Sequence, residues 1–303
     1  MDKFYDRVSD IFVNMDEKKS VGIPVIILIL AIVVILSAYL LTGYPIKLGM
    51  DFVGGVQYTG NTELSELQIR ELFSDYPLQD VRSSGDRYII LFEFVDKETS
   101  DGLKRLIQQN FTNVEEKTIA PAYSKSLQQT ALKALAISFL GVALVIFLLF
   151  KKIIPSITVI AAIFSDIVIT IAFMNILNIE LTMGTLAAIL MLIGYSADSN
   201  VLLNDRVFKR SGELNEKIKE ACGIGLTMTT TTLGALVVMY IVATYLNYIV
   251  PIVPTIPLLT QISSVLIIGL LADIMNTWMF NAGVLKTYVG SFTRSRKFGR
   301  RFL

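Results

Sequence analysis

The sequence predicts a polytopic α-helical membrane protein with six transmembrane helices and a small α+β ferredoxin-like extracytoplasmic domain between the first and second helices. The 303-residue chain is 53% hydrophobic and only 17% charged, with a mean hydropathy of +0.60. Its apolar residues gather in runs long enough to cross a bilayer, which takes about 20 residues. One polar stretch, residues 43–126, separates the first run from the other five.

The N-terminal part of the chain predicts a membrane anchor. Residues 1–20 form a polar segment of mixed charge, expected in the cytoplasm, and residues 21–42 form the first span. The apolar run is too long for the core of a signal peptide and has no convincing small-residue cleavage site. We therefore expect the anchor to stay uncleaved.

The polar stretch at 43–126 predicts the element order strand, helix, strand, strand, helix, strand. This is the order of the ferredoxin-like split βαβ arrangement. Thr62 is expected to cap the first helix, and Ser84-Gly85-Asp86 to form a hairpin turn. Because such folds serve many functions, the pattern predicts only a binding or coupling module. The expected elements are 52–59, 62–73, 79–83, 87–94, 97–109 and 112–119.

The remaining apolar runs predict five more spans and a fixed orientation. With the N-terminus inside, the inner segments hold most of the Lys and Arg residues, whereas the two short outer loops, 178–180 and 247–257, hold none. The positive-inside rule then places both termini in the cytoplasm and the polar domain outside. The spans are expected at about 131–150, 153–177, 181–206, 223–248 and 258–285, within residues 127–288, before a basic cytoplasmic tail at 289–303. Topological anchoring explains this tail better than a grip on a ribosome or on anionic membrane lipid.

Composition excludes several kinds of chemistry. The chain has no histidine, so His-ligated metal sites are ruled out and proton handling falls to carboxylates. A single cysteine, Cys222, rules out an internal disulfide. No soluble catalytic motif is visible. We expect no enzyme activity, no cofactor, no metal and no nucleic-acid partner.

Carboxylates inside the spans are the candidate functional groups. Asp166, Asp198 and Asp273 lie within the third, fourth and sixth spans. A charge at such a depth costs a few kcal/mol or more, so we expect at least one of the three to be protonated, or to be offset by a bound cation or by a partner's arginine. Asp205 shares a helical face with Asp198 and, with Arg206, is expected nearer the interface.

A polar layer is expected to support these acids. Its candidate members are Thr229, Thr230, Asn200 and Asn276. For the threonines, bonding to their own helix backbone is favoured over a ligand role, because hydroxyls in membrane helices more often serve packing.

Three motifs resemble the SecD/SecF family of protein-export membrane subunits, which belongs to the resistance–nodulation–division superfamily. Asp51, Gly54 and Gly55 fit the D-F-x-G-G signature that opens the outer domain on the SecF side. Residues 198–207, Asp-Ser-Asn-Val-Leu-Leu-Asn-Asp-Arg-Val, resemble the fourth-span motif, and residues 164–170 the third-span motif. Ser165 stands where bacterial members commonly have histidine, and this departure is typical of archaeal members.

The resemblance implies a function and partners. It implies an accessory subunit of the Sec translocation machinery in the cytoplasmic membrane, working with SecD, the translocation channel and an unfolded secretory polypeptide, and coupled to H⁺ or Na⁺. Asp166 and Asp198 would bind and release the ion. Two alternatives stay open: half of an ion-coupled small-molecule efflux transporter, and a purely structural stabiliser of the translocon.

Overall fold

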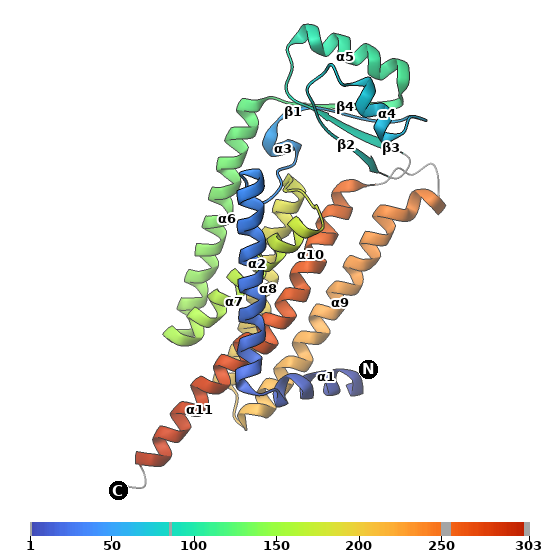
Figure 1. Cartoon of the computed structure of the whole chain (residues 1–303). Helices are drawn as coiled ribbons and strands as arrows, with labels where there is room; N and C mark the ends of the chain where they lie inside the picture. Colours follow the sequence, from blue (N-terminus) through green and yellow to red (C-terminus); the bar gives the residue numbers. More distant parts are fainter. Residues whose placement is uncertain (1, 85–86, 250–255, 300–303) are drawn as a thin grey trace. The chain divides into compact units, whose positions relative to one another are not determined.

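The computed structural model describes residues 2–84, 87–249 and 256–299 (Figure 1). Gly85 and Asp86 of the expected hairpin turn, part of the second outer loop, and Arg300 and Arg301 of the basic tail lie outside the described residues. The chain forms two compact units. The helical unit comprises 1–47, 135–180 and 184–303, and the α/β unit comprises 48–134 together with 181–183.

Among the residues that the structure describes, six helices are long and apolar enough to cross a membrane, which confirms the predicted number of spans. They are α2 (Glu17–Thr42), α6 (Pro121–Phe150), α7 (Ile153–Ile176), α8 (Met183–Lys209), α9 (Leu214–Ile249), and a last span made of α10 (Pro257–Met275), η1 (Asn276–Asn281) and α11 (Ala282–Gly299). A short helix, α1 (Asp2–Asn14), precedes them.

Two helices begin earlier than predicted, and the last span is not uniform. α6 begins at Pro121 and α9 at Leu214, whereas 131 and 223 were expected. Apolar runs mark only the part of a helix that needs lipid, and proline is well suited to a first helical turn. The last span contains a π-helical turn, η1, which the apolar pattern does not encode.

The α/β unit has the predicted ferredoxin-like topology. Its strands are β1 (Gly55–Asn61), β2 (Leu78–Ser84), β3 (Arg87–Phe92) and β4 (Thr112–Ile119), and its helices include α4 (Glu66–Leu72) and α5 (Lys97–Asn110). The sheet order is β2-β3-β1-β4 with every neighbouring pair antiparallel, as in a split βαβ fold. Its core holds Phe73 and Phe92 edge to face, with ring centroids 5.2 Å apart.

Two details at the start of this unit correct the prediction. Residues 50–53 form a short helix, α3 (Met50–Val53), where the first strand was expected to begin. The cap of α4 is Ser65 and not Thr62. Ser65 and Gln68 form a reciprocal capping box, which satisfies two backbone donors instead of one.

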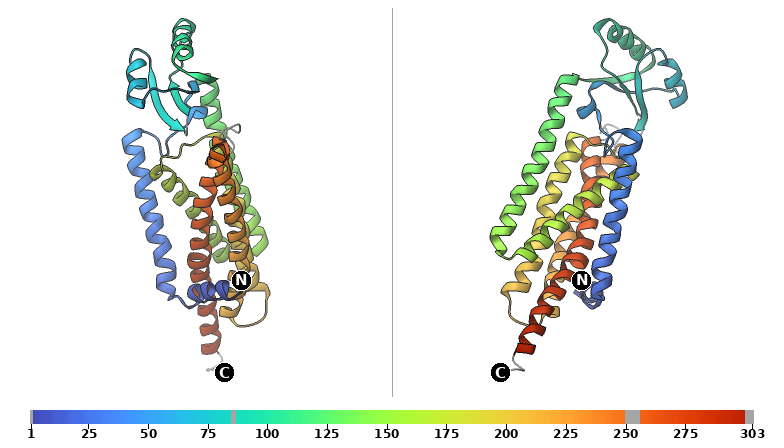
Figure 2. Two further views of the ribbon diagram at one scale, coloured as in Figure 1. Left: turned by 90° about the vertical axis from the view of Figure 1, so that its right-hand side faces the viewer. Right: turned by 60° about the vertical axis from the view of Figure 1, so that its left-hand side comes forward.

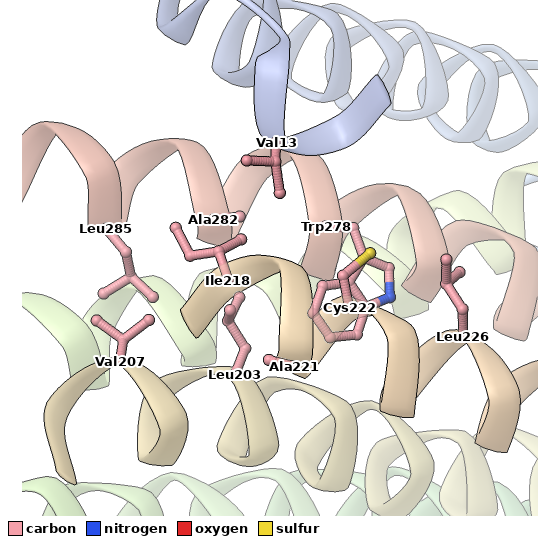
Figure 3. Packing of buried hydrophobic residues seen from close by; sticks show 10 residues of the cluster. All are labelled: Val13, Leu203, Val207, Ile218, Ala221, Cys222, Leu226, Trp278, Ala282 and Leu285. Carbon is pink, nitrogen blue, oxygen red and sulfur yellow. The ribbon is translucent and has the colours of Figure 1, made fainter. Parts of the chain in front are cut away.

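The helical unit is held together by helix contacts around α7 and the last span. α10 packs on both α7 and α9, and α2 packs on α7 (Figure 2). An apolar cluster joins α1, α8, α9 and the last span around the fully buried Trp278 (Figure 3). Gly225 makes this packing possible, since a Cβ there would stand 2.2 Å from Cζ2 of the indole.

Candidate functional site

Asp166, in the middle of α7, is the centre of a buried polar network in the helical unit. Its side chain is fully buried. Ser196 of α8 donates to Oδ2, and Asn276 of η1 donates to Oδ1 at 2.6 Å and to Ser165 Oγ at 3.0 Å. One carboxylate therefore joins three membrane helices.

Asp273 is the second buried acid of this network. Its side chain is also fully buried, and Thr277 donates to its Oδ1 at 2.9 Å. Asn276 links the two acids, because its side chain donates to Asp166 and its backbone N–H donates to the Asp273 carbonyl. Asp166 and Asp273 therefore belong to one site, which we call the acid pair.

The π-helical turn explains how the last span supplies so many polar groups. A π turn places more residues per turn than an α-helix and often occurs at functional sites. Asn276, Thr277, Trp278, Met279 and Asn281 are all buried. Ser20 of α2 donates to the Met279 carbonyl at 2.8 Å, so a neighbouring helix supplies a donor within the wide turn.

A second tier of amides continues along α8. Asn281 donates to Asn200 Oδ1 at 2.7 Å, and Asn200 donates to the Ser196 carbonyl at 2.8 Å. Asn204, one turn further, donates to the Asn200 carbonyl at 2.9 Å. Ser196 belongs to both tiers and so connects the amides to the acid pair.

Acceptor oxygens are in excess in this network. Among the described residues, Asp273 Oδ2 and the Oδ1 atoms of Asn204, Asn276 and Asn281 are buried without a hydrogen-bond partner. Unpaired buried acceptors are rare in proteins, and each calls for an explanation. No three His, Cys, Asp or Glu side chains in the described part of the chain could hold a metal ion together. Carboxylate, amide and hydroxyl oxygens suit a proton or a hard cation instead.

The predicted acids separate into two groups. The structure brings Asp166, Asp273 and Asn276 together, and Asn200 joins them through Ser196. It does not bring Asp198 to them, because that side chain points out of the helical unit and is exposed. The functional roles of these residues stay predictions.

The two predicted interfacial residues are paired with neighbours. Asp205 lies 2.5 Å from Lys209 one turn later on α8, and Arg206 lies 2.6 Å from Glu220 on α9. Both contacts are partly exposed, and pairs of this kind contribute little to stability. They fit the end of a membrane helix better than the centre of a site.

The predicted threonine layer serves the helix backbone. Thr229 donates to the Gly225 carbonyl at 3.0 Å, and Thr230 donates to the Leu226 carbonyl at 2.6 Å. Tyr5 of α1 also reaches the Thr230 hydroxyl, at 2.8 Å. These contacts agree with the favoured interpretation, backbone bonding in place of a ligand role, which stays a prediction.

The signature residues at the start of the α/β unit have geometric roles. Gly54 has φ +83° and Gly55 has φ +130°, in the region that favours glycine. A Cβ at Gly55 would stand 2.2 Å from the Phe92 carbonyl oxygen. Asp51 lies 2.7 Å from Lys117 and accepts the Met183 backbone N–H.

Five side chains of the network were not among the predicted site residues. These are Ser165, Ser196, Asn204, Thr277 and Asn281. Ser196 opens the polar run Ser-Ala-Asp-Ser-Asn, which was a usable signal. Asn281 gave a weaker signal, a single amide after an apolar stretch. The sequence does not show that this amide faces α8, because its direction depends on the π turn.

Comparison with known proteins identifies the family. The family described as "Protein export membrane protein SecD/SecF, C-terminal" matches residues 99–291. The chain belongs to the SecD/SecF family. Within this family, the chain is similar to archaeal SecF proteins. A relative from Methanolacinia petrolearia, named "Protein-export membrane protein SecF", is 41% identical over 90% of this chain and 94% of its own length.

Two further relatives with the same name extend this result. The protein from Haloferax volcanii is 35% identical over 91% of this chain and 94% of its own length. The protein from Pyrococcus furiosus is 35% identical over 92% of this chain and 93% of its own length. The matches span both the helical and the α/β units, so the whole chain is a multi-pass membrane protein with a role in protein export.

Proposed function

We propose that the chain couples an ion gradient, most simply a proton gradient, to protein export across the cytoplasmic membrane. The observation that carries this proposal is the buried carboxylate of Asp166, held by donors from α8 and η1 beside a second buried acid. The family relatives' names supply the export context.

The physical reason for coupling is the cost of charge in this position. An ionised carboxylate inside a membrane protein costs several kcal/mol unless a proton, a cation or a partner offsets it. Binding an ion at Asp166 changes the acceptors offered to Ser196 and Asn276. Because these donors lie on different helices, a change in occupancy alters the packing of α7 against α8 and the last span.

We propose SecD as the partner half, and the exposed face of α8 supports this. Asp198 is exposed on that face, together with Ala187, Met191 and Gly194. A carboxylate facing lipid is costly, and small residues let another helix approach closely. Transporters of this architecture work as two pseudo-symmetric halves with the ion site near their interface.

The remaining parts of the proposal concern orientation and the client. The distribution of Lys and Arg favours cytoplasmic termini and an extracytoplasmic α/β unit. In that position the α/β unit would act on an unfolded secretory polypeptide leaving the channel. A gradient of about 100 mV is worth some 2.3 kcal/mol per charge, enough to bias a two-state movement.

Asp166→Asn tests the coupling. In cells depleted of the wild-type chain, we expect export with this variant to fall to the rate seen when the gradient is collapsed. The amide keeps the shape of the side chain but cannot exchange a proton in the same way. Asp75→Asn, at an exposed position of the α/β unit, is the control and should export at the wild-type rate. If gradient-dependent export persists in Asp166→Asn, the coupling role of Asp166 is contradicted, and the chain is better described as a structural stabiliser of the translocon.

Asp198→Leu tests the partner surface. The substitution removes an exposed carboxylate from a membrane helix, so the chain by itself should be as stable as the wild type or more so. We expect copurification of a second six-span chain to fall at least about fivefold, since an interfacial charge pair contributes on the order of 1 kcal/mol or more. Leu144→Met, at an exposed position of α6 outside this face, is the control and should copurify as the wild type does. Equal copurification of Asp198→Leu and wild type would contradict a partner contact through Asp198.

A further inference from the structure

A three-residue stretch before and at the start of α8 belongs to the α/β unit. Residues 181–183 are grouped with 48–134 and not with the rest of α8. Leu181 pairs with Leu48 as a parallel β-bridge, and Gly49 N–H donates to the Leu181 carbonyl at 2.8 Å. The chain just before the short helix α3 therefore holds the chain that leads into α8.

Asp51 completes this attachment with its side chain. Its Oδ2 accepts the backbone N–H of Met183 at 2.9 Å, and its Oδ1 accepts from Lys117 Nζ at 2.7 Å. Met183 is the first residue of α8, where backbone N–H groups lack partners within the helix. A carboxylate at this end of a helix also interacts favourably with the helix dipole. Both oxygens of Asp51 are thus in use, and its side chain is only 15% exposed.

The surroundings fix Asp51 in this position. Phe52, the next residue, is 1% exposed, and its carbonyl accepts from Gln128 Nε2. Gly49 precedes α3 with an extended backbone, and Gly54 ends it with φ +83°. Lys117 lies in β4, so the Oδ1 atom of Asp51 is bound by a residue of the four-stranded sheet. The carboxylate is therefore anchored from two sides and is not a freely rotating surface group.

We infer that Asp51 is a positioning residue that fastens the first residue of α8 to the α/β unit. α8 carries Ser196, which donates to Asp166, and Asn200 of the second tier. The first residue of α8, which Asp51 holds in the α/β unit, is thus continuous through one helix with the residues that contact the acid pair. The attachment rests on the contacts of Asp51 with Met183 and Lys117. A role of this attachment in export rests on the proposed function.

Hydrogen exchange of the full-length chain in lipid nanodiscs tests the fastening. In Asp51→Ala, we expect the backbone amides at the start of α8 to exchange about five- to tenfold faster, as for loss of a helix cap. Amides in the middle of α8 and in β1 should keep their wild-type rates. Asp51→Asn keeps an acceptor oxygen for Met183 and should restore most of the protection. Asp101→Ala, at an exposed position of α5, is the matched control and should change neither region.

A second variant removes the donor of the hydrogen bond between Met183 and Asp51 instead of its acceptor. Met183→Pro removes the backbone donor at the first helical position, where proline is well tolerated. We expect it to speed exchange in the first turn of α8 as much as Asp51→Ala does, and the double variant to add nothing further. Because the donor and acceptor are removed separately, a folding defect of one variant does not obscure the other.

The outcomes separate the fastening from the proposed function. Unchanged exchange at the start of α8 in both Asp51→Ala and Met183→Pro would overturn the fastening. So would fully additive effects in the double variant. If the exchange results hold but gradient-dependent export stays at the wild-type rate in Asp51→Ala, the fastening stands and its use in coupling is overturned. If Asp166→Asn also exports normally, the failure belongs to the proposed function.

Discussion

Replacing Asp166 with alanine is expected to destabilise the helical unit by about 3 kcal/mol. The substitution removes the acceptor that Ser196 and Asn276 share and leaves two buried donors without their main partner. Losing the partner of a buried polar group costs about 1–3 kcal/mol for each group. Chemical denaturation of the purified chain in detergent, followed by Trp278 fluorescence, measures the loss, because Trp278 lies two residues from Asn276 and is the only tryptophan.

Two variants sharpen this measurement. Asp166→Asn keeps two polar atoms, and the Ser196 hydroxyl can turn to accept a hydrogen bond, so we expect a smaller loss of about 1 kcal/mol. Asp75→Ala changes an exposed carboxylate and should stay within about 0.5 kcal/mol of wild type. An Asp166→Ala variant as stable as Asp75→Ala would show that the network does not depend on this acid.

Gly55→Ala is expected to destabilise the α/β unit by at least about 3 kcal/mol. Gly55 has φ +130°, a conformation that residues with a Cβ rarely adopt. The new methyl group would stand 2.2 Å from the Phe92 carbonyl oxygen, and this oxygen belongs to β3 at the centre of the sheet. A strand backbone cannot move aside as a flexible side chain can. We expect limited proteolysis of the full chain to cut the α/β unit at least tenfold faster.

Gly102→Ala is the matched control for Gly55→Ala. Gly102 lies inside α5 of the same unit, and a Cβ there would meet only the Tyr76 hydroxyl, at 3.2 Å. Alanine in a helix interior is favoured over glycine by about 0.5–1 kcal/mol, so proteolysis should stay the same or slow down. Similar cleavage rates for the two variants would show that Gly55 is not constrained as its geometry indicates.

The spans and the individual strands could be predicted because each depends on a pattern that one segment carries by itself. A membrane span needs only an apolar run, and alternation marks a strand such as β3. The cap of α4 was misplaced because Thr62 and Ser65 both suit a cap, and only Ser65 has Gln68 three residues later. The π turn was missed because its residues differ little in character from an α-helical segment.

The site was only partly predictable because burial is a property of the assembled helices. Asp166 and Asp198 look equally costly in sequence, since both lie within apolar spans. The bundle buries Asp166 and exposes Asp198, a distinction that depends on which face of α8 meets α7. Ser196 and Asp198 stand two residues apart on one helix, so they point to different sides.

The wide turn in the last span has a mechanical consequence. Successive residues of an α-helix are rotated by about 100°, and a π turn holds roughly one extra residue per turn. Rewinding η1 into a regular α-helix would therefore twist the segment after Asn281 by about 100° around its own axis. Lys286 would leave the Val13 carbonyl, which now accepts from it at 2.6 Å, and Gly283 would leave Ser20. A local change beside the acid pair is thus geometrically linked to the contact between α1 and the first turns of α11.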